Sequence, residues 1–256
     1  MKNLLKKFTH YFTKLIYPNG IKCIFCGDEL NQNEYNSTCE SCLKKLPFIN
    51  NYCEKCGNPI RKDEIGVCFS CKTTNYNFNK ARSVFVYIDE VLKTIHKFKY
   101  NNGKYLYKPL AKFMLEFYAT QSMFADCVTY VPMFKKKEKL RGYNQAKLLA
   151  NEFANKLNLP IFDFCEKVID NESQTSLDLK ERRDNVKDTF KFKTELKKDI
   201  KDKVVLIIDD IFTTGATSNE ISKILINAGA KDCFVLTLAH TPLGEKELNS
   251  LSKPNK

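Results

Sequence analysis

The stretch VVLIIDDIFTTGATS, residues 204–218, decides the fold that this chain can adopt. Its unbroken apolar run predicts a buried strand that delivers Asp209 and Asp210 at its carboxyl end. A turn into a helix follows, made of Thr213, Thr214, Gly215, Ala216 and Thr217. Backbone N–H groups at a helix N-terminus form a nest for a phosphate, the threonine hydroxyls add donors, and the glycine permits close approach. The two carboxylates beside this nest are placed to accept hydrogen bonds from a sugar diol or to hold Mg²⁺.

Two other interpretations of the acid pair are weaker. A strand that ends in Asp-Asp could be the Walker B element of a nucleotide hydrolase, but the chain contains no G-x-x-x-x-G-K-[ST] motif among its nine glycines. A receiver-type acidic pocket would need carboxylates from several strand ends, and it would not place a phosphate nest directly downstream. We therefore favour a sugar-phosphate site.

Upstream of this stretch, strand and helix patterns alternate from Ala81 onward. The periodicities predict strands at 83–88, 126–133, 203–209 and 232–239, with a short strand near 164–169. They predict helices at 91–100, 105–119, 145–157 and 218–229, and a long exposed loop at 170–185. Alternation of this kind indicates an α/β fold with a parallel sheet covered by helices, and function at the carboxyl ends of the strands.

Eight of the 11 cysteines form four successive C-x-x-C pairs: Cys23/Cys26, Cys39/Cys42, Cys53/Cys56 and Cys68/Cys71. Two pairs complete one tetrahedral thiolate shell, so the spacing predicts two Zn²⁺ sites. Residues 20–75 lack a periodic apolar pattern, and we therefore expect structural zinc that supplies the folding free energy. The alternatives are a thioredoxin-like redox pair, an iron–sulfur cluster or structural thiols. The spacing leaves open whether the pairs join in order or interleave.

The other three cysteines, Cys127, Cys165 and Cys233, fall in predicted strands. We expect them to be buried there as small apolar residues with no chemistry.

Composition sets the wider limits. The 256 residues leave room for one α/β core and a smaller module. No apolar run approaches the roughly 20 residues of a membrane span, so we expect a cytoplasmic protein without an integral membrane segment. The net charge of +12 favours an anionic partner, although 37 Lys against five Arg is also what an AT-rich genome produces. The expected parts are an amphipathic helix at 1–19, a double zinc ribbon at 20–75, the α/β domain at 81–241 and a surface tail at 242–256.

Several segments resemble known families. Residues 204–218 resemble the phosphoribosyl-pyrophosphate (PRPP) signature of type I phosphoribosyltransferases. Residues 95–103, 130–150 and 173–190 are similar to ComF-type competence proteins, which join a zinc-ribbon module to a phosphoribosyltransferase-like domain. The resemblance implies a parallel-sheet type I phosphoribosyltransferase-like domain behind a small N-terminal zinc-ribbon module.

The resemblance also implies roles for individual residues. Thr213, Thr214, Gly215, Ala216 and Thr217 would hold the 5′-phosphate of PRPP, and Asp209 and Asp210 would face the ribose 2′- and 3′-hydroxyls in the presence of Mg²⁺. A loop after the strand at 128–133 would act as the pyrophosphate loop, with Lys135, Lys136, Lys137, Lys139 and Arg141. The loop at 170–185 would act as the flap that closes over the reaction, with Lys180, Arg182 and Arg183. Either loop could instead be a solvated basic turn.

The R-G-[FY]-N-Q signature places Asn144 and Gln145 at a helix start, where they could cap the helix or orient a substrate. Lys99 and Tyr100 match a family motif as well. For catalysis, the candidates are Asp209, Asp210, Lys180 and Arg182.

Three functions fit these features. The first is a PRPP-dependent transferase, for which no acceptor pocket can be read from the sequence. The second, which the ComF resemblance favours, is a protein of DNA uptake that binds PRPP and single-stranded DNA, with a DNA-translocating helicase as partner. The third is a PRPP-sensing regulator. Seven aromatic residues interspersed with cations in the cysteine-rich region could stack on a single strand or fill its small core: Phe25, Tyr35, Phe48, Tyr52, Phe69, Tyr76 and Phe78.

Overall fold

The computed structural model describes residues 22–30, 35–61, 63–100, 102–170 and 188–242. The chain divides into two compact units, Met1–Leu46 and Pro47–Lys256. The helix predicted at 1–19 lies outside the described residues, as does nearly all of the tail predicted at 242–256. The domain boundaries expected near residues 19, 75 and 241 stay predictions.

The first unit holds the first two cysteine pairs. A short 3₁₀ turn, η1 (Tyr35–Ser37), is followed by helix α2 (Glu40–Lys45). Cys39 is the N-cap of α2, and its sulfur accepts a hydrogen bond from the N–H of Cys42. Among the described residues of this unit, α2 is the only α-helix, and the sulfur cluster is the feature that organises them.

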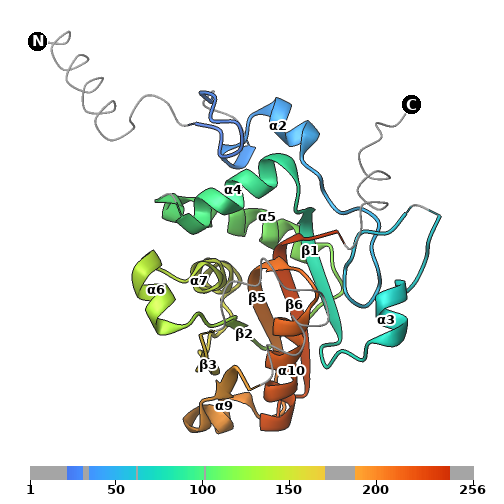
Figure 1. The fold of residues 1–256 in the computed structure, drawn as a ribbon, viewed down its shortest axis with the longest axis vertical. Helices are drawn as coiled ribbons and strands as arrows, with labels where there is room; N and C mark the ends of the chain where they lie inside the picture. Colours follow the sequence, from blue (N-terminus) through green and yellow to red (C-terminus); the bar gives the residue numbers. More distant parts are fainter. Residues whose placement is uncertain (1–21, 31–34, 62, 101, 171–187, 243–256) are drawn as a thin grey trace, which may run out of the picture. The chain divides into compact units, whose positions relative to one another are not determined.

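The second unit is built on a four-stranded parallel sheet with the order β1-β6-β5-β2 (Figure 1). The strands are β1 (Lys80–Val86), β2 (Cys127–Tyr130), β5 (Val204–Phe212) and β6 (Asp232–His240). Their residues are almost all buried, which is what a parallel sheet covered on both faces requires. The parallel α/β fold that the sequence predicted is confirmed.

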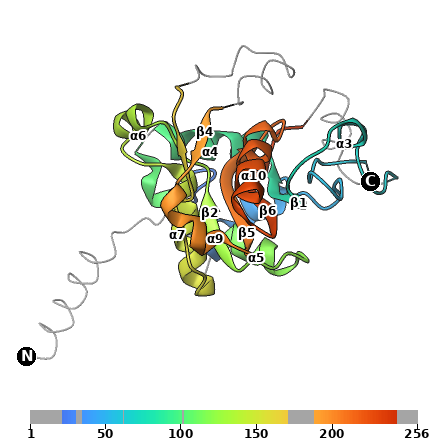
Figure 2. The same ribbon diagram turned by 90° about the horizontal axis from the view of Figure 1, so that it is seen from below.

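Helices cover both faces of this sheet. Helix α10 (Ala216–Ala228) lies on one face, and helices α5 (Tyr107–Ala119) and α7 (Gln145–Leu157) pack together on the other (Figure 2). Because strand side chains alternate, Val205 and Ile207 of β5 share a core with Ile221 and Leu225 of α10. The intervening residues of β5 point toward α5 and α7.

The remaining elements connect and flank the sheet. Helix α4 (Asp89–Tyr100) and the 3₁₀ turn η2 (Gly103–Leu106) lead into α5, and helix α6 (Lys135–Arg141) leads toward α7. After α7 come the antiparallel strands β3 (Cys165–Lys167) and β4 (Phe190–Phe192), then η4 (Thr194–Leu196) and α9 (Lys197–Ile200). The helix predicted at 145–157 has those bounds in the structure.

Most predicted bounds shift by a few residues, and two differences between prediction and structure lie at the candidate site. The segment expected as a basic loop after β2 contains helix α6, because five of its seven residues are lysine or arginine and all seven are tolerated in a helix that ends at Gly142. Strand β5 does not stop at Asp209 but continues to Phe212, since β6 supplies ladder partners as far as His240. On its other side, β2 pairs only up to Ile208, so the acid pair lies just beyond the end of that neighbouring strand.

The flap predicted at 170–185 lies between β3 and β4, and almost all of it is outside the described residues. Its two flanks are held in an antiparallel ladder, in which Cys165 is opposite Phe192 and Lys167 is opposite Phe190. The N–H of Val168 extends the pairing by donating to the carbonyl of Thr189 at 2.8 Å.

The third and fourth cysteine pairs belong to the second unit, where they are joined to β1 by a buried cation. Arg82 is only 6% exposed, and its Nη1 donates to the carbonyls of Glu54 at 3.0 Å and Cys53 at 3.4 Å. Its guanidinium lies 4.4 Å from the centroid of the Tyr52 ring. A Cβ at Gly57 would come within 2.6 Å of the carbonyl oxygen of Ala81, so only glycine permits this approach to the sheet.

None of the helices in the described part of the chain has the length and apolar character needed to span a bilayer.

Candidate functional site

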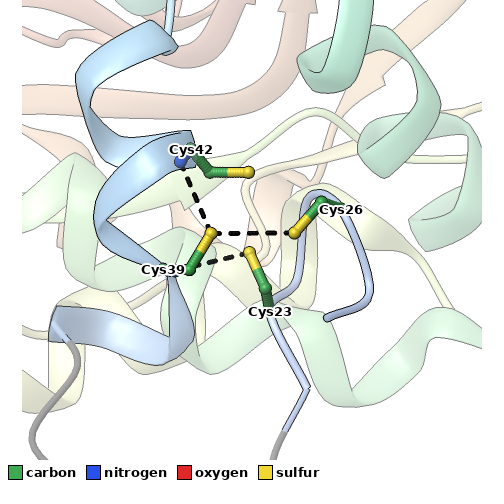
Figure 3. A group of neighbouring side chains, drawn as sticks. All are labelled: Cys23, Cys26, Cys39 and Cys42. Atoms are coloured by element: carbon green, nitrogen blue, oxygen red, sulfur yellow. Dashed lines mark hydrogen bonds between the residues drawn. The ribbon is translucent and has the colours of Figure 1, made fainter. Parts of the chain in front are cut away.

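The first cysteine cluster is shown in Figure 3. The sulfurs of Cys23, Cys26, Cys39 and Cys42 all lie within 4.8 Å of one another. Cys26 Sγ is 3.7 Å from Cys39 Sγ, and the N–H of Cys39 donates to Cys23 Sγ at 3.4 Å (Figure 3). Hydrogen bonds of this kind stabilise a thiolate, which is the form that binds metal.

The second cluster repeats this geometry with Cys53, Cys56, Cys68 and Cys71. In both clusters the first cysteine N–H donates to a carbonyl five residues later, at 2.7 and 2.8 Å, and its carbonyl accepts from a glycine N–H at 3.0 Å. Those glycines, Gly27 and Gly57, have positive φ. The sulfurs of Cys56 and Cys68 are 3.7 Å apart, as in the first cluster.

These distances fit zinc. A tetrahedral shell with Zn–S bonds of about 2.3 Å places its sulfurs about 3.8 Å apart. The pairs join in order and do not interleave, which answers the question that the spacing left open. The two tetracysteine groups therefore support two structural zinc sites.

The other three cysteines, Cys127, Cys165 and Cys233, are at most 2% exposed. They lie in the core shared with α10, as the sequence predicted.

The acid pair on β5 has a lysine partner that comes from the end of α4. Asp210 is 9% exposed, and its Oδ2 lies 2.9 Å from Nζ of Lys99. Asp209 is partly exposed, and its Oδ1 accepts the backbone N–H of Asp210 at 2.8 Å. One carboxylate is thus neutralised within the protein, while the other keeps acceptor capacity for a ligand.

Asp209 has a pKa well above the ordinary value of an aspartate. Burial, and then the negative charge of Asp210, raise the pKa of Asp209 to about 8. Burial lowers the pKa of Lys99, but the ion pair with Asp210 outweighs it and leaves that pKa raised. For Lys167 on β3, burial and then the charge of Lys137 lower the pKa, and Asp209 acts in the opposite direction. Near neutral pH, the site holds a carboxyl that a cationic or hydroxyl-bearing ligand can ionise.

The turn that the sequence predicts to hold a phosphate begins where β5 ends. Gly215 is the N-cap of α10 with φ +74, and a Cβ there would lie 2.5 Å from Cζ of Phe212 and 3.2 Å from Cε1 of Tyr76. The hydroxyl of Tyr76 donates to the carbonyl of Thr214 at 3.0 Å, and Thr214 Oγ1 accepts the N–H of Ala216 at 3.3 Å. The segment that follows the second cysteine cluster therefore supports this turn through Tyr76.

Two cavities are lined by lysines that interact with the acid pair, Lys99 in one and Lys167 in the other. One, of about 440 Å³, is lined by Lys99, Tyr100, Lys137 and Arg141 among others. The other, of about 220 Å³, is lined by lysines and carboxylates: Lys135, Lys147, Lys167, Lys193, Glu138, Asp163 and Glu166. Helix α6 separates the predicted pyrophosphate-loop residues, since Lys135 at its start lines the smaller cavity and Arg141 at its end lines the larger.

The R-G-Y-N-Q stretch, residues 141–145, fixes the start of helix α7 and the side chain of Arg141. Asn144 is the N-cap of α7: its Oδ1 accepts the N–H of Lys147 at 3.3 Å, and its Nδ2 donates to the carbonyl of Val131 at 3.0 Å. Gln145 is 1% exposed, and its Oε1 accepts a hydrogen bond from Arg141 Nη1 at 2.8 Å. Asn144 therefore caps helix α7, as one of the two predicted roles required, and Gln145 holds the side chain of Arg141; orientation of a substrate by either residue stays a prediction.

Comparisons with known proteins agree with this architecture. Family models match in two places: a double zinc ribbon domain at residues 12–72 and a phosphoribosyl transferase domain at residues 144–251. In order along the chain, these regions resemble a double zinc ribbon and a phosphoribosyltransferase domain.

Three curated relatives cover most of the chain. Competence protein F of Haemophilus influenzae is 28% identical over 226 residues, which are 86% of this chain and 97% of that protein. Competence protein ComFC of Bacillus subtilis is 25% identical over 228 residues, 81% of this chain and 89% of the relative. DNA utilization protein YhgH of Salmonella typhimurium is 24% identical over 209 residues, 79% and 90% of the two chains. The resemblance to ComF-type competence proteins is confirmed.

Not every predicted site residue is brought together in the described part of the phosphoribosyltransferase domain. Asp209, Asp210 and the turn at 213–217 are adjacent along β5 and the start of α10. Lys180, Arg182 and Arg183 lie outside the described residues. Lys167, which has no motif of its own, was missed; its position directly before the predicted flap was the available signal.

The aromatic residues of the cysteine-rich region are mostly structural. Phe25, Tyr76 and Phe78 are at most 7% exposed, and Tyr52 lies against the guanidinium of Arg82. Phe69, in helix α3 (Phe69–Thr73), is 82% exposed. For the buried rings, the core-filling interpretation holds over the stacking one.

Proposed function

We propose that the phosphoribosyltransferase domain binds PRPP with Mg²⁺. The turn at 213–217 would hold the 5′-phosphate, because successive N–H groups at the start of α10 and the threonine hydroxyls are donors for a dianion. Asp209 and Asp210 would accept hydrogen bonds from the ribose 2′- and 3′-hydroxyls, and Mg²⁺ would bind beside them through carboxylate and phosphate oxygens.

The basic side chains around the acid pair would hold the pyrophosphate group. Lys167 reaches the site from β3, and Lys135 lines the same cavity from the start of α6. Little covalent chemistry is needed for transfer from PRPP, so positioning and charge stabilisation would carry any rate. Lys180 and Arg182 of the flap stay proposed partners of the transition state.

One observation carries this proposal: an acid pair with a single dedicated lysine, placed directly before a glycine turn at a helix N-terminus. The raised pKa of Asp209 adds a signature that can be measured. Since a ligand that needs this carboxylate ionised must displace its proton, binding below about pH 8 should release protons.

Isothermal titration calorimetry with Mg²⁺-PRPP tests the proposal. The wild-type protein should bind, with a heat that depends on the ionisation enthalpy of the buffer at pH 7. Asp209→Asn should abolish binding, whereas Asp232→Asn, at the opposite end of the sheet, should bind like the wild type. Absence of binding by zinc-loaded, folded wild-type protein would refute it.

The cellular role that we propose is DNA uptake, in which the protein binds single-stranded DNA. The curated relatives are named competence and DNA utilization proteins, and the net charge of +12 suits a polyanion. A DNA-translocating helicase stays a proposed partner through the ComF resemblance. Pyrophosphate release with candidate acceptors would distinguish an active transferase from a binding protein or a PRPP sensor.

A further inference from the structure

The two cysteine clusters share one geometry but differ in how much of each is open to solvent. In the second cluster, Cys53 is 0% exposed and Cys56 is 3% exposed, and the other two cysteines pack against the core of the second unit. In the first cluster, Cys23 is 3% exposed, but Cys26 is exposed and the other two cysteines are half-buried. The equivalent positions Cys26 and Cys56 therefore differ in their access to a dissolved reagent.

The second cluster is also tied to the sheet by hydrogen bonds. Arg82 of β1 donates to two carbonyls in the first turn of this cluster, and the N–H of Ala81 donates to the carbonyl of Lys55 at 2.8 Å. Among the described residues, the backbone hydrogen bonds of the corresponding turn in the first cluster stay within the first unit. One of them joins the N–H of Ile24 to the carbonyl of Ser37 at 2.9 Å. Opening of the second cluster must therefore break bonds to β1, whereas opening of the first need not.

In each cluster, one sulfur of the first pair lies close to one sulfur of the second pair. Cys26 Sγ is 3.7 Å from Cys39 Sγ, a contact that Figure 3 shows, and Cys56 Sγ is 3.7 Å from Cys68 Sγ. The oxidation of a cysteine depends on its thiolate character and on its exposure. Because the two distances are equal and the two ligand sets are the same, exposure decides which cluster reacts first.

We propose that the first cluster is an oxidation site for hydrogen peroxide, at which Cys26 and Cys39 form a disulfide. The thiolate of Cys26 attacks one oxygen of the peroxide, the O–O bond breaks, and Cys26 becomes a sulfenic acid while hydroxide leaves and takes up a proton. The thiolate of Cys39 then attacks the sulfur of the sulfenic acid and expels its oxygen as a second hydroxide, which also takes up a proton. Two thiolates, one peroxide and two protons thus give one disulfide and two waters, with two electrons passing from sulfur to oxygen.

The disulfide removes two of the four ligands of the first zinc site. A structural zinc ion needs all four ligands of its tetrahedral shell, so the ion should leave and the folding free energy that it supplies should be lost. The first unit should then lose its structure, because the sulfur cluster organises its described residues. The second unit should keep its sheet and its own cluster. This proposal does not depend on the binding of PRPP.

The test uses zinc-loaded, full-length protein treated with hydrogen peroxide. Released zinc is followed with a colorimetric chelator, and disulfides are mapped by mass spectrometry after free thiols have been blocked. One zinc ion per chain should leave at least about 10-fold faster than the other, because the second cluster reacts only when the core around it opens. The Cys26–Cys39 disulfide should accumulate with the first ion, and a Cys56–Cys68 disulfide should not.

Two matched variants check the role of the exposed thiolate. Cys26→His and Cys56→His each leave a Cys₃His ligand set, which structural zinc sites also use, and the zinc content of both is measured before treatment. Cys26→His should lose the fast phase of zinc release, whereas Cys56→His should keep it together with the Cys26–Cys39 disulfide. Should either variant bind fewer than two zinc ions, the disulfide map of the wild type decides alone.

Three results would overturn the proposal: release of both zinc ions at one rate, a Cys56–Cys68 disulfide that forms as early as Cys26–Cys39, or fast zinc release with any first-cluster product other than the Cys26–Cys39 disulfide. Differential scanning calorimetry adds a structural measurement. In protein that has lost one zinc ion to peroxide, the second unit should unfold at the same Tm as in untreated protein. A lower Tm would contradict confinement of the reaction to the first cluster.

Discussion

Two glycine-to-alanine variants test whether the phosphate turn is locked by the rings beneath it. Gly215→Ala places a methyl 2.5 Å from Cζ of Phe212, in a residue with φ +74. Gly142→Ala, at the end of α6, has φ +86 but no heavy atom within 4 Å of the new methyl. Both variants lie in the second unit, and both carry the same kind of backbone penalty, so the difference between them isolates the clash.

The magnitudes follow from this contrast. An L side chain at positive φ costs about 1–2 kcal/mol, which both variants should lose. Phe212 cannot move aside at little cost, because it is 3% exposed and lies between Phe78, at 6.1 Å, and His240, at 4.9 Å. Insertion of a methyl into such a packed core costs about a further 1–3 kcal/mol. For a protein of this size, that difference lowers the Tm by about 2–12 °C more in Gly215→Ala than in Gly142→Ala.

Urea and thermal unfolding, followed by circular dichroism on zinc-loaded protein, give both quantities. Equal losses of unfolding free energy in the two variants, within about 0.5 kcal/mol, would show that the rings yield and that the turn is not locked. Since the proposed 5′-phosphate site is this same turn, Gly215→Ala should also weaken binding of Mg²⁺-PRPP, which calorimetry measures.

Three further outcomes are expected. Tyr76→Phe removes the hydroxyl that donates to the carbonyl of Thr214, so the unfolding free energy measured in urea titrations should fall by about 1–3 kcal/mol. A loss below about 0.5 kcal/mol would contradict a supporting role for this hydrogen bond. The raised pKa of Asp209 stabilises the folded state fully below about pH 4, and this stabilisation is lost as the pH rises through about 8. The unfolding free energy of the wild type relative to that of Asp209→Asn should therefore fall between about pH 6.5 and 8.5. A difference that stays constant over this range would refute the raised pKa. Chelation of zinc should release two metal ions per chain, and Cys56→Ser should lower the Tm of the second unit whereas Cys26→Ser should not, as differential scanning calorimetry can show.

Much of this architecture could be predicted from local patterns. The apolar run at 204–208 and the spacing of the cysteines each depend on neighbours in the sequence, and both gave the correct element or cluster. The extension of β5 to Phe212 could not be predicted in the same way, because it depends on ladder partners that β6 supplies from more than 20 residues away. Helix α6 was missed since a run of lysines reads equally well as a loop and as an exposed helix.

The site was predictable in its parts and not in its connections. Asp210 and the turn at 213–217 could be identified from one segment of the sequence. The ion pair between Asp210 and Lys99, however, joins residues that are 111 positions apart, and only a family motif pointed to that lysine. Nothing local marks Arg82 as a buried cation, since most of its partners are far away in the sequence: the carbonyls of Cys53 and Glu54 and the side chain of Gln121. Burial of Tyr76 and Phe78 was likewise decided by β5 and α10, which lie far downstream.

The hydrogen bond from Tyr76 to the carbonyl of Thr214 means that the second cysteine cluster and the proposed sugar-phosphate site share one scaffold. A gene rearrangement that separated residues 47–80 from the sheet would remove the side chains that support the turn at 213–217. Residues 47–80 and the sheet must therefore be inherited together. If zinc holds the second cluster, the same dependence would make the proposed site sensitive to metal supply, since the chain would then lack the segment that supports its turn.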